Sequence, residues 1–281
     1  MGTPEAQATL RRLAVARRVI YVLVAVAVLV PFVYPLPFRF RPSPWSEKVF
    51  KKVEALKPGS PILFSFDFDP SAMAELYPMS LALLRHCLQR DLHPIVMTHW
   101  QSGVGITKQI IEEAAKERGK QSGKDYVFLG FRAGGSNLVL NMGESLQGAF
   151  AKDFFKQPTE GMPALEGVRS LKDIPLVIDI AAGTAIEMWI AYGRDRFGFD
   201  LGAGCTAVIA PDLYPFLQSG QLVGVLGGLR GAADYEMLMK RPGSATKGMQ
   251  AQSLTHVLII LLIVGANVHY LSRRLKGSTK G

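Results

Sequence analysis

Acidic residues are almost absent from the two ends of this 281-residue chain. The first 18 residues hold four arginines and one acid, Glu5, while the residues after Leu271 hold four basic side chains and no acid. These tails carry formal charges of +3 and +4, which leaves only +2 of the net +9 for everything between them. Because a nucleic-acid-binding domain needs basic residues clustered on one surface, the charge pattern argues against nucleic acid as a partner.

Cysteine is scarce, since the chain has only Cys87 and Cys205. One disulfide would fit an oxidising compartment, but two buried free thiols are the more common arrangement, and the sequence leaves both open. The glycine-rich stretches lack the G-x-G-x-x-G and G-x-x-x-x-G-K-[ST] spacings. The usual nucleotide-binding fingerprints are therefore missing.

Charge is also missing from two long apolar stretches, residues 19–37 and 254–271. Each is about as long as a helix that crosses the hydrocarbon core of a membrane. A cleavable signal peptide is the alternative for the first stretch, but prolines follow it instead of a small-residue cleavage site. A buried core helix is the alternative for the second. We predict two transmembrane helices and therefore expect the lipid bilayer to be a partner.

The basic tails predict the orientation of these helices. Basic residues next to a span favour the cytoplasmic side, so we expect both termini in the cytoplasm and the central domain outside it. Arg39 and Arg41 follow the first span and nearly balance its local charge, but long domains cross membranes largely regardless of charge. The short tails therefore decide the prediction.

Between the spans, short apolar runs alternate with segments of helical periodicity. We expect strands at residues 62–66, 93–98, 126–131, 174–180, 206–210 and 222–226. Strands separated by helices predict a doubly wound, mostly parallel α/β sheet, Rossmann-like or flavodoxin-like. The expected organisation is a basic tail (1–18), transmembrane helix (19–37), linker with a short helix (38–60), α/β domain (61–240), linker (241–253), transmembrane helix (254–271) and basic tail (272–281).

Chemically useful residues follow the predicted strands at their carboxyl ends, where open α/β sheets bind ligands. The candidate catalytic residues are Asp67, Asp69, Thr98 and His99. The candidate ligand-binding residues lie in turns whose backbone amides suit an anion: Arg132, Gly134, Gly135, Gly183 and Thr184. The candidate ligands for a hard cation such as Mg²⁺ are Asp67, Asp69 and Asp179.

Each acid also has a structural interpretation. Asp69-Pro-Ser is typical of a turn and a helix N-cap, and Asp67 can accept hydrogen bonds from loop amides. Asp179 lies within a predicted strand and needs a partner, which Arg132 or Arg230 can supply. These interpretations compete directly with a catalytic or metal site.

A Cys–His pair is a further alternative. His99 and Cys205 are the residue types of the caspase-like α/β proteases, whose histidine and cysteine follow adjacent strands. The predicted strand at 206–210 places Cys205 before its strand, at the wrong end of the sheet for this geometry. We do not expect this pair to be catalytic.

The segment Asp67-Phe-Asp69 after an apolar strand resembles the first motif of the haloacid-dehalogenase-like phosphohydrolases. The resemblance implies that Asp67 is a nucleophile and Asp69 a general acid/base, with Thr98 as the hydroxyl motif. It covers roughly forty residues. The flap after the first motif and a lysine in the third-motif role are missing, and only Asp179 and the more distant Glu187 stand for the final acidic pair.

The runs from Asp179 to Tyr235 and from Tyr126 to Gly135 resemble a set of prokaryotic two-span membrane proteins without an assigned activity. This resemblance supports membrane placement only. We therefore expect a membrane-anchored, non-enzymatic α/β domain that binds a ligand or a partner within a membrane complex, with another membrane protein or a second copy as partner and no cofactor. The alternative is an Mg²⁺-dependent hydrolase of phosphate esters that uses Asp67, Asp69 and Asp179.

Overall fold

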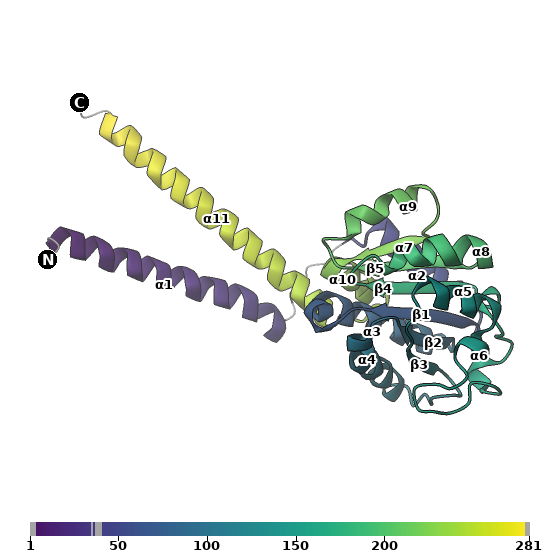
Figure 1. Cartoon of the computed structure of the whole chain (residues 1–281). Coiled ribbons are helices and arrows are strands. Elements are labelled where there is room, and N and C mark those ends of the chain that lie inside the picture. The colour runs from purple at the N-terminus through teal and green to yellow at the C-terminus, as the bar shows by residue number, and fades with distance from the viewer. Residues whose placement is uncertain (1–3, 35, 37–40, 279–281) are drawn as a thin grey trace. The chain divides into compact units, whose positions relative to one another are not determined.

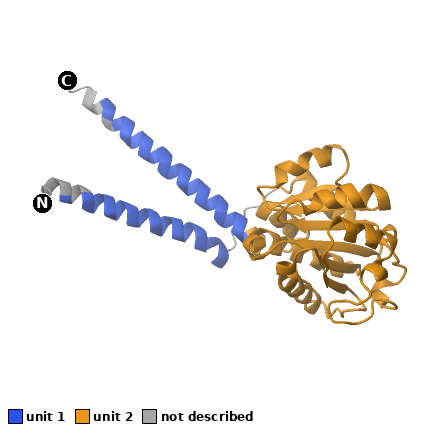
Figure 2. Cartoon of the chain, in the orientation of Figure 1, with its two compact units in different colours: residues 1–39, 247–281 blue, residues 40–246 orange. Residues whose placement is uncertain are grey.

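A computed structural model describes residues 4–34, 36 and 41–278 of the chain. The start of the predicted linker (38–40) and the chain ends (1–3 and 279–281) lie outside the described residues. Two compact units are present (Figure 2). Residues 40–246 form the α/β domain, and residues 1–39 with 247–281 form the other unit.

The domain is built on a six-stranded sheet in which every neighbouring pair of strands is parallel (Figure 1). The strand order is β3-β2-β1-β4-β5-β6, so the chain winds outward in both directions from the β1–β4 pair. The strands are β1 (Pro61–Asp67), β2 (His93–Thr98), β3 (Val127–Phe131), β4 (Leu176–Ala181), β5 (Asp200–Cys205) and β6 (Gly224–Gly227). The predicted doubly wound parallel α/β fold is confirmed.

Helices cover both faces of the sheet (Figure 1). They are α2 (Pro44–Glu54), α3 (Met73–Gln89), α4 (Val104–Lys116), α5 (Ser136–Glu144), α6 (Leu146–Ala149), α7 (Ala185–Trp189), α8 (Asp195–Phe197), α9 (Tyr214–Gln218) and α10 (Gly228–Leu238). A π-helix, Ile190–Arg194, joins α7 to α8. One large core cluster joins Leu63 of β1 and Val177 of β4 to Val139 of α5 and Trp189 of α7. Burial of apolar residues on both faces explains why β1 and β4 are almost uninterrupted apolar runs.

The predicted strand at 206–210 is wrong, because the fifth strand is Asp200–Cys205. Its sequence, DLGAGC, contains two glycines, which weaken a strand by propensity and therefore predict a loop. The packing explains them: a Cβ atom at Gly204 would lie 2.5 Å from Sδ of Met79. The correction moves Cys205 from the amino end to the carboxyl end of its strand.

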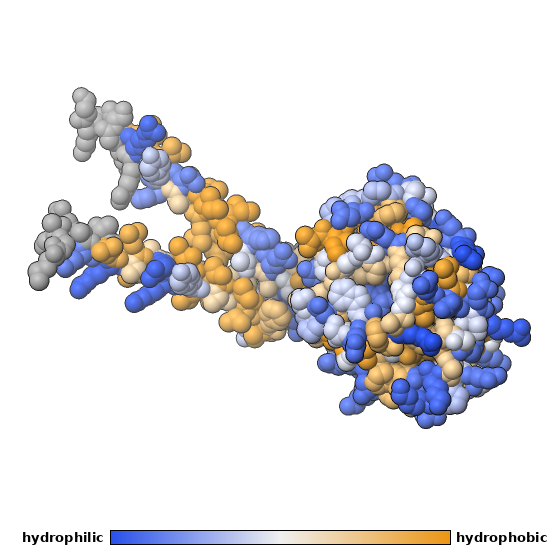
Figure 3. Space-filling view, in the orientation of Figure 1, coloured by the Kyte–Doolittle hydropathy of each residue, from blue (hydrophilic) through white to orange (hydrophobic). Residues whose placement is uncertain are grey.

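The two long terminal helices are α1 (Pro4–Val33) and α11 (Ser244–Ser278). Within their segments Leu10–Val33 and Ser244–Ser272, an 18-residue stretch has a mean hydropathy of 2.3 and 1.9, respectively, and both segments are long and apolar enough to cross a membrane. Apolar residues are exposed along both helices (Figure 3). Residues 244–253, which were predicted to belong to a linker, are the first turns of α11.

A side chain links the two terminal segments within their unit. Gln250 of α11 accepts a hydrogen bond from the Leu36 amide at 3.2 Å and donates one to the Leu36 carbonyl at 2.7 Å. The amide of one glutamine thus satisfies both backbone groups of a residue that follows α1.

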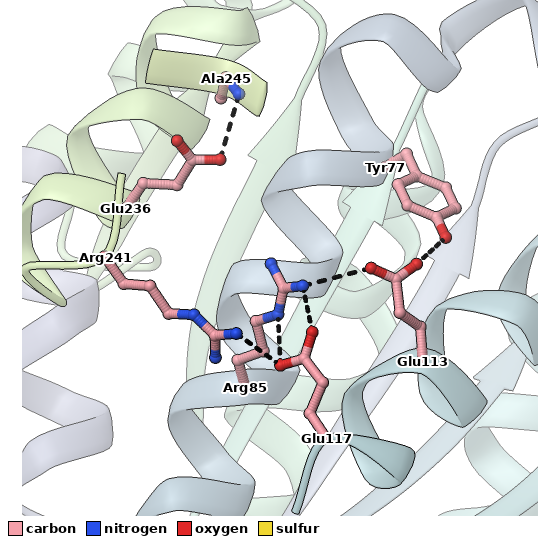
Figure 4. A network of polar contacts seen from close by, with 7 residues as sticks. All are labelled: Tyr77, Arg85, Glu113, Glu117, Glu236, Arg241 and Ala245. Carbon is pink, nitrogen blue, oxygen red and sulfur yellow. Dashed lines mark hydrogen bonds and ion pairs between the residues drawn. The ribbon is translucent and has the colours of Figure 1, made fainter. Parts of the chain in front are cut away.

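The start of α11 is capped from within the α/β domain by Glu236 of α10. Its carboxylate accepts hydrogen bonds from the amides of Gly243, Ala245 and Thr246 at 2.8–3.1 Å and from the Thr246 hydroxyl at 2.6 Å. Figure 4 shows the bond from the Ala245 amide. The first amides of a helix have no partner inside the helix, and a carboxylate suits their partial positive charge. Glu236 therefore fixes where α11 begins.

A neighbouring ion-pair network joins α3, α4 and the segment after α10 (Figure 4). Arg85 pairs with both Glu113 and Glu117, Arg241 donates to Glu117 at 2.8 Å, and the Tyr77 hydroxyl donates to Glu113 at 2.6 Å. Burial and the Glu113 carboxylate raise the pKa of Tyr77 to about 12. The partly exposed network ties the segment before α11 to two helices of the domain.

Candidate functional site at the junction of β1 and β4

Three polar side chains meet at the junction of β1 and β4, where the strand order reverses. Ser65 and Asp67 are two residues apart on β1, so they point to the same face of the sheet. Asp179 of β4 lies in register beside Ser65. All three side chains have 0% exposure, which makes this a polar cluster inside the core. Ligands bind near such reversal points in open α/β folds, so this junction is the candidate site.

Asp67 accepts hydrogen bonds at both carboxylate oxygens. The Ser65 hydroxyl lies 2.7 Å and His99 Nδ1 3.1 Å from Oδ2, and the His99 amide lies 2.6 Å and the Thr98 hydroxyl 3.4 Å from Oδ1. Burial alone would raise the pKa of Asp67, but hydrogen bonds from His99 and Ser65 and the charge of His99 outweigh burial and lower it. Asp67 is therefore a stabilised, buried carboxylate.

Asp179 has the opposite surroundings. Within the described structure neither of its carboxyl oxygens has a hydrogen-bond donor from another residue. Burial and the negative charge of Asp67 raise the pKa of Asp179 well above its ordinary value. Asp179 is paired in register with Ser65, two residues before Asp67 on the same face of β1, so the two acids are neighbours. Neither arginine proposed as a partner of Asp179 contacts it in the described part of the chain: Arg230 pairs with Asp234, and Arg132 lies over the Phe150 ring.

Other buried polar atoms without a hydrogen-bond partner in the described structure include His99 Nε2, on the residue that contacts Asp67, and Trp189 Nε1. The His99 and Trp189 rings meet edge to face with centroids 5.8 Å apart. A proton on His99 Nδ1 can be donated to Asp67, and this leaves Nε2 facing the core without a partner. Unsatisfied buried atoms are rare in folded proteins, and several around one carboxylate mark this junction as unusual.

The helix that carries Trp189 is itself irregular. The segment after β4 is divided into α7, the π-helix Ile190–Arg194 and α8 instead of forming one continuous α-helix. π-Helical turns are rare and are frequently found at functional sites. This irregularity directly follows Trp189, on the face of the sheet that holds the acids.

The other sequence-predicted catalytic residues divide into two groups. Thr98 and His99 join Asp67, as the polar ends of neighbouring strands were expected to do. Asp69 instead caps the 3₁₀ turn Pro70–Ala72, since its Oδ1 accepts from the Ser71 amide at 2.9 Å and from the Ser71 hydroxyl. These bonds lower the pKa of Asp69. The capping interpretation of Asp69 is confirmed.

The arrangement does not fit Mg²⁺. The oxygens of Asp67 are occupied by protein donors, burial and the charge of Asp67 raise the pKa of Asp179 and so disfavour its ionised form, and Asp69 is bonded to Ser71. Over the described ranges, no group of three or more His, Cys, Asp or Glu side chains is placed to hold a metal ion. Hard cations need ionised, available oxygens, so we derive no metal-dependent step.

The predicted ligand-binding residues lie in the turns around this edge of the sheet. Arg132 is exposed and its guanidinium lies 5.7 Å from the centroid of the Phe150 ring. Gly134 and Gly135 have positive φ and form the turn into α5. Gly183 lies against the Trp100 indole, because a Cβ atom there would lie 3.6 Å from that ring. The fifth residue, Thr184, is exposed before α7.

Cys205 cannot act with His99. Strands β1 and β4 separate β2 from β5, which places the two residues roughly 14 Å apart at about 4.8 Å per strand. Burial and nearby acids, Glu75 first, raise the pKa of Cys205 to about 12, so the thiol stays protonated. Cys87 and Cys205 are both free and buried, and the disulfide alternative is excluded.

Sequence reasoning missed Ser65 and Trp189. The alternation of β1 contained a signal for Ser65, since a polar residue two positions before Asp67 must share its face. Trp189 carried no such signal, because an apolar helical position gives no hint of an unpartnered indole N–H. Comparisons with protein-family models, curated proteins and solved structures find no match.

Proposed function

We propose that this chain is a two-pass membrane protein whose α/β domain acts by binding within a membrane complex and not by catalysis. The observation that carries the proposal is the state of Asp67. Its two oxygens accept hydrogen bonds from protein groups inside a closed core, so the best candidate nucleophile is not presented to a substrate. A carboxylate saturated in this way supports a structural or sensing role.

The two apolar helices support membrane anchorage. Exposed Val, Ile and Leu side chains run along α1 and α11, and such surfaces are stable only in lipid or against other apolar helices. Basic residues near both termini favour the cytoplasm. The proposed topology has both termini inside and the α/β domain outside. The strand order, which is that of Rossmann-type folds, supports a binding role at the β1–β4 reversal.

A membrane partner is supported by the composition of α11. A Cβ atom at Gly265 would meet nothing within 4 Å, and Ala266 follows it. Small residues let transmembrane helices approach closely. We propose that α11 packs through this position against a second copy of the chain or a helix of another membrane protein.

Energy transfer between two differently labelled copies in lipid vesicles tests whether α11 packs against a second copy of the chain. The wild-type chain should transfer energy, Gly265→Leu should reduce it strongly, and Val264→Leu should leave it nearly unchanged. Equal transfer in all three chains would remove Gly265 from the contact. No transfer in any chain would exclude a second copy and leave only a different membrane protein as partner.

The alternative function is phosphate-ester hydrolysis. The approach of the Thr98 hydroxyl to Asp67 favours it, because it brings together two residues of the resembling motifs. Phosphatase activity measured with p-nitrophenyl phosphate and Mg²⁺ distinguishes the two functions. We expect the full chain and a folded Asp67→Asn variant to show the same background rate, whereas a Mg²⁺-dependent rate lost in Asp67→Asn would establish the hydrolase.

A further inference from the structure

The two acids at the β1–β4 junction are buried side by side, but they differ in the hydrogen bonds that they receive. Ser65, Thr98 and His99 supply hydrogen-bond donors to Asp67. Asp179 receives none in the described part of the chain, although its side chain is completely buried. An ionised carboxylate in that position would have no compensation for its lost hydration.

We propose that Asp67 and Asp179 form a proton-binding site that holds one proton between them, carried by Asp179, and that loss of this proton at higher pH loosens the junction of β1 and β4. This inference goes beyond the proposed membrane role and does not depend on it. The proton site also replaces the predicted metal site. Protein hydrogen-bond donors occupy the oxygens of Asp67 and leave them unavailable to Mg²⁺, whereas a proton can still bind to the pair.

The physical argument is electrostatic. Two like charges in a low-dielectric interior repel strongly, so two neighbouring buried carboxylates cannot both ionise at ordinary pH. Asp67 is the carboxylate that the protein solvates, and this leaves the proton on Asp179. The proton also gives Asp179 a hydrogen bond to donate, and Asp67 is the neighbouring acceptor on the paired strand.

The neighbouring elements determine how the pair responds to pH. His99, directly after β2, is the basic group that contacts Asp67, and on β5 the thiol of Cys205 lies within electrostatic range of Asp179. Glu75 and Asp212 act on Cys205 and add negative charge farther away. The helical segment over this face contributes Ile186, Trp189 and Ile190, which do not titrate. The surroundings therefore oppose a second negative charge.

Release of the proton has a defined structural consequence. Ionised Asp179 would repel Asp67, and the repulsion would act between two central strands that are paired from Ile62 to Asp67. Trp189 contacts His99, so its emission reports on movement of the cluster. The pair can thereby convert a change in pH outside the domain into a change at its most buried strand junction.

Infrared spectroscopy of the full chain, in a detergent without carbonyl groups, tests the proposal. The wild-type chain should show the carbonyl stretch of a protonated carboxylic acid at neutral pH, with a downshift in ²H₂O. Asp179→Asn should lose this band. Asp234→Asn is the matched control and should keep it, because Asp234 is equally buried but paired with Arg230.

Titration of the band tests proton release. In the wild type the band should fall at alkaline pH, with a parallel change in tryptophan emission that is lost in Trp189→Phe. In Asp67→Asn the band should titrate at lower pH, because the repelling charge is gone and the new amide can stabilise ionised Asp179. This comparison decides the question even if Asp179→Asn does not fold.

Four results would overturn the proposal. They are a neutral wild-type spectrum without the band, a band that survives Asp179→Asn, a midpoint unchanged by Asp67→Asn, and a band constant until the domain unfolds. Loss of the band on addition of Mg²⁺ at neutral pH would instead assign the pair to a metal. The proposed membrane role would be unaffected by any of these outcomes.

Discussion

Asp67 and Asp179 lie together in the core on neighbouring strands, yet the protein surrounds the first with hydrogen-bond donors and, over the described residues, gives the second none. Ser65 and His99 bond to Asp67 from β1 and from the end of β2. The asymmetry assigns the charge to Asp67 and the proton to Asp179. It also explains why hydrogen bonding lowers the pKa of one acid while burial raises the pKa of the other.

Substitution of the two acids by asparagine should therefore have unequal effects. The amide introduced by Asp179→Asn can donate to Asp67 as the protonated acid does, so this variant should be at least as stable as the wild type at neutral pH. Asp67→Asn should lower the free energy of unfolding by about 3 kcal/mol, because it places an amide N–H against the Ser65 and His99 donors. Denaturant unfolding of the full chain in detergent measures both. Equal losses would contradict the assignment of charge and proton.

Two glycine-to-alanine substitutions should change the stability of the domain in opposite directions. A Cβ atom at Gly143 of α5 would lie 1.9 Å from the Phe197 ring, and such overpacking costs about 2 kcal/mol. Gly105 of α4 has open space around its Cβ position, so Gly105→Ala should stabilise the domain by roughly 0.5–1 kcal/mol through helix propensity. Thermal unfolding compares them. Stabilisation by both would mean that the α5–α8 packing is looser than described.

The Glu236 cap should control the start of α11. Glu236→Gln keeps the size of the side chain but removes its charge, and it should lower stability by about 1–2 kcal/mol. Amide hydrogen exchange should quicken at Gly243, Ala245 and Thr246 in this variant. Glu113→Gln is the control, since its carboxylate is part of the more exposed network. Unchanged exchange at the three amides would show that Glu236 does not cap α11.

The orientation in the membrane predicts a labelling pattern. Cys87 and Cys205 are buried, so a cysteine introduced by Glu160→Cys in an exposed loop should be the main reactive thiol of the domain. A membrane-impermeant maleimide should label it in intact cells. Arg12→Cys near the N-terminus should be labelled only after permeabilisation. The reverse pattern would place the domain in the cytoplasm.

Much of the fold could be predicted because burial on both faces makes strands such as β1 and β4 into apolar runs with clear ends. β5 could not be predicted, because its Gly204 is explained by close contacts with Met79 and Ile180, and the local sequence gives no sign of these contacts. In the site, Asp67, Thr98 and His99 were found as polar ends of adjacent strands.

The partners of the buried side chains in the site were less predictable than the location of the site. Whether Asp179 met an arginine or another acid depended on strand order and register, which hydropathy does not specify. The indole N–H of Trp189, which lacks a partner among the described residues, likewise follows from tertiary packing and from the π-helix after it.

The pH dependence of unfolding tests the shared proton most directly. The pKa of Asp179 is raised in the folded state, so below the ordinary aspartate value of 3.8 both states hold the proton and the contribution of Asp179 to stability is complete. Above that pH the unfolded state ionises first, and wild-type stability should fall by up to ~1.4 kcal/mol per pH unit until the folded pKa is reached.

The measurement is the free energy of unfolding of the full chain and of Asp179→Asn from about pH 4 to pH 8. Asp67 remains in both chains, so its own stabilisation, which is lost as pH falls, largely cancels in the difference. The account predicts that the advantage of Asp179→Asn over the wild type grows steadily as pH rises. A difference that stays constant over this range would contradict it.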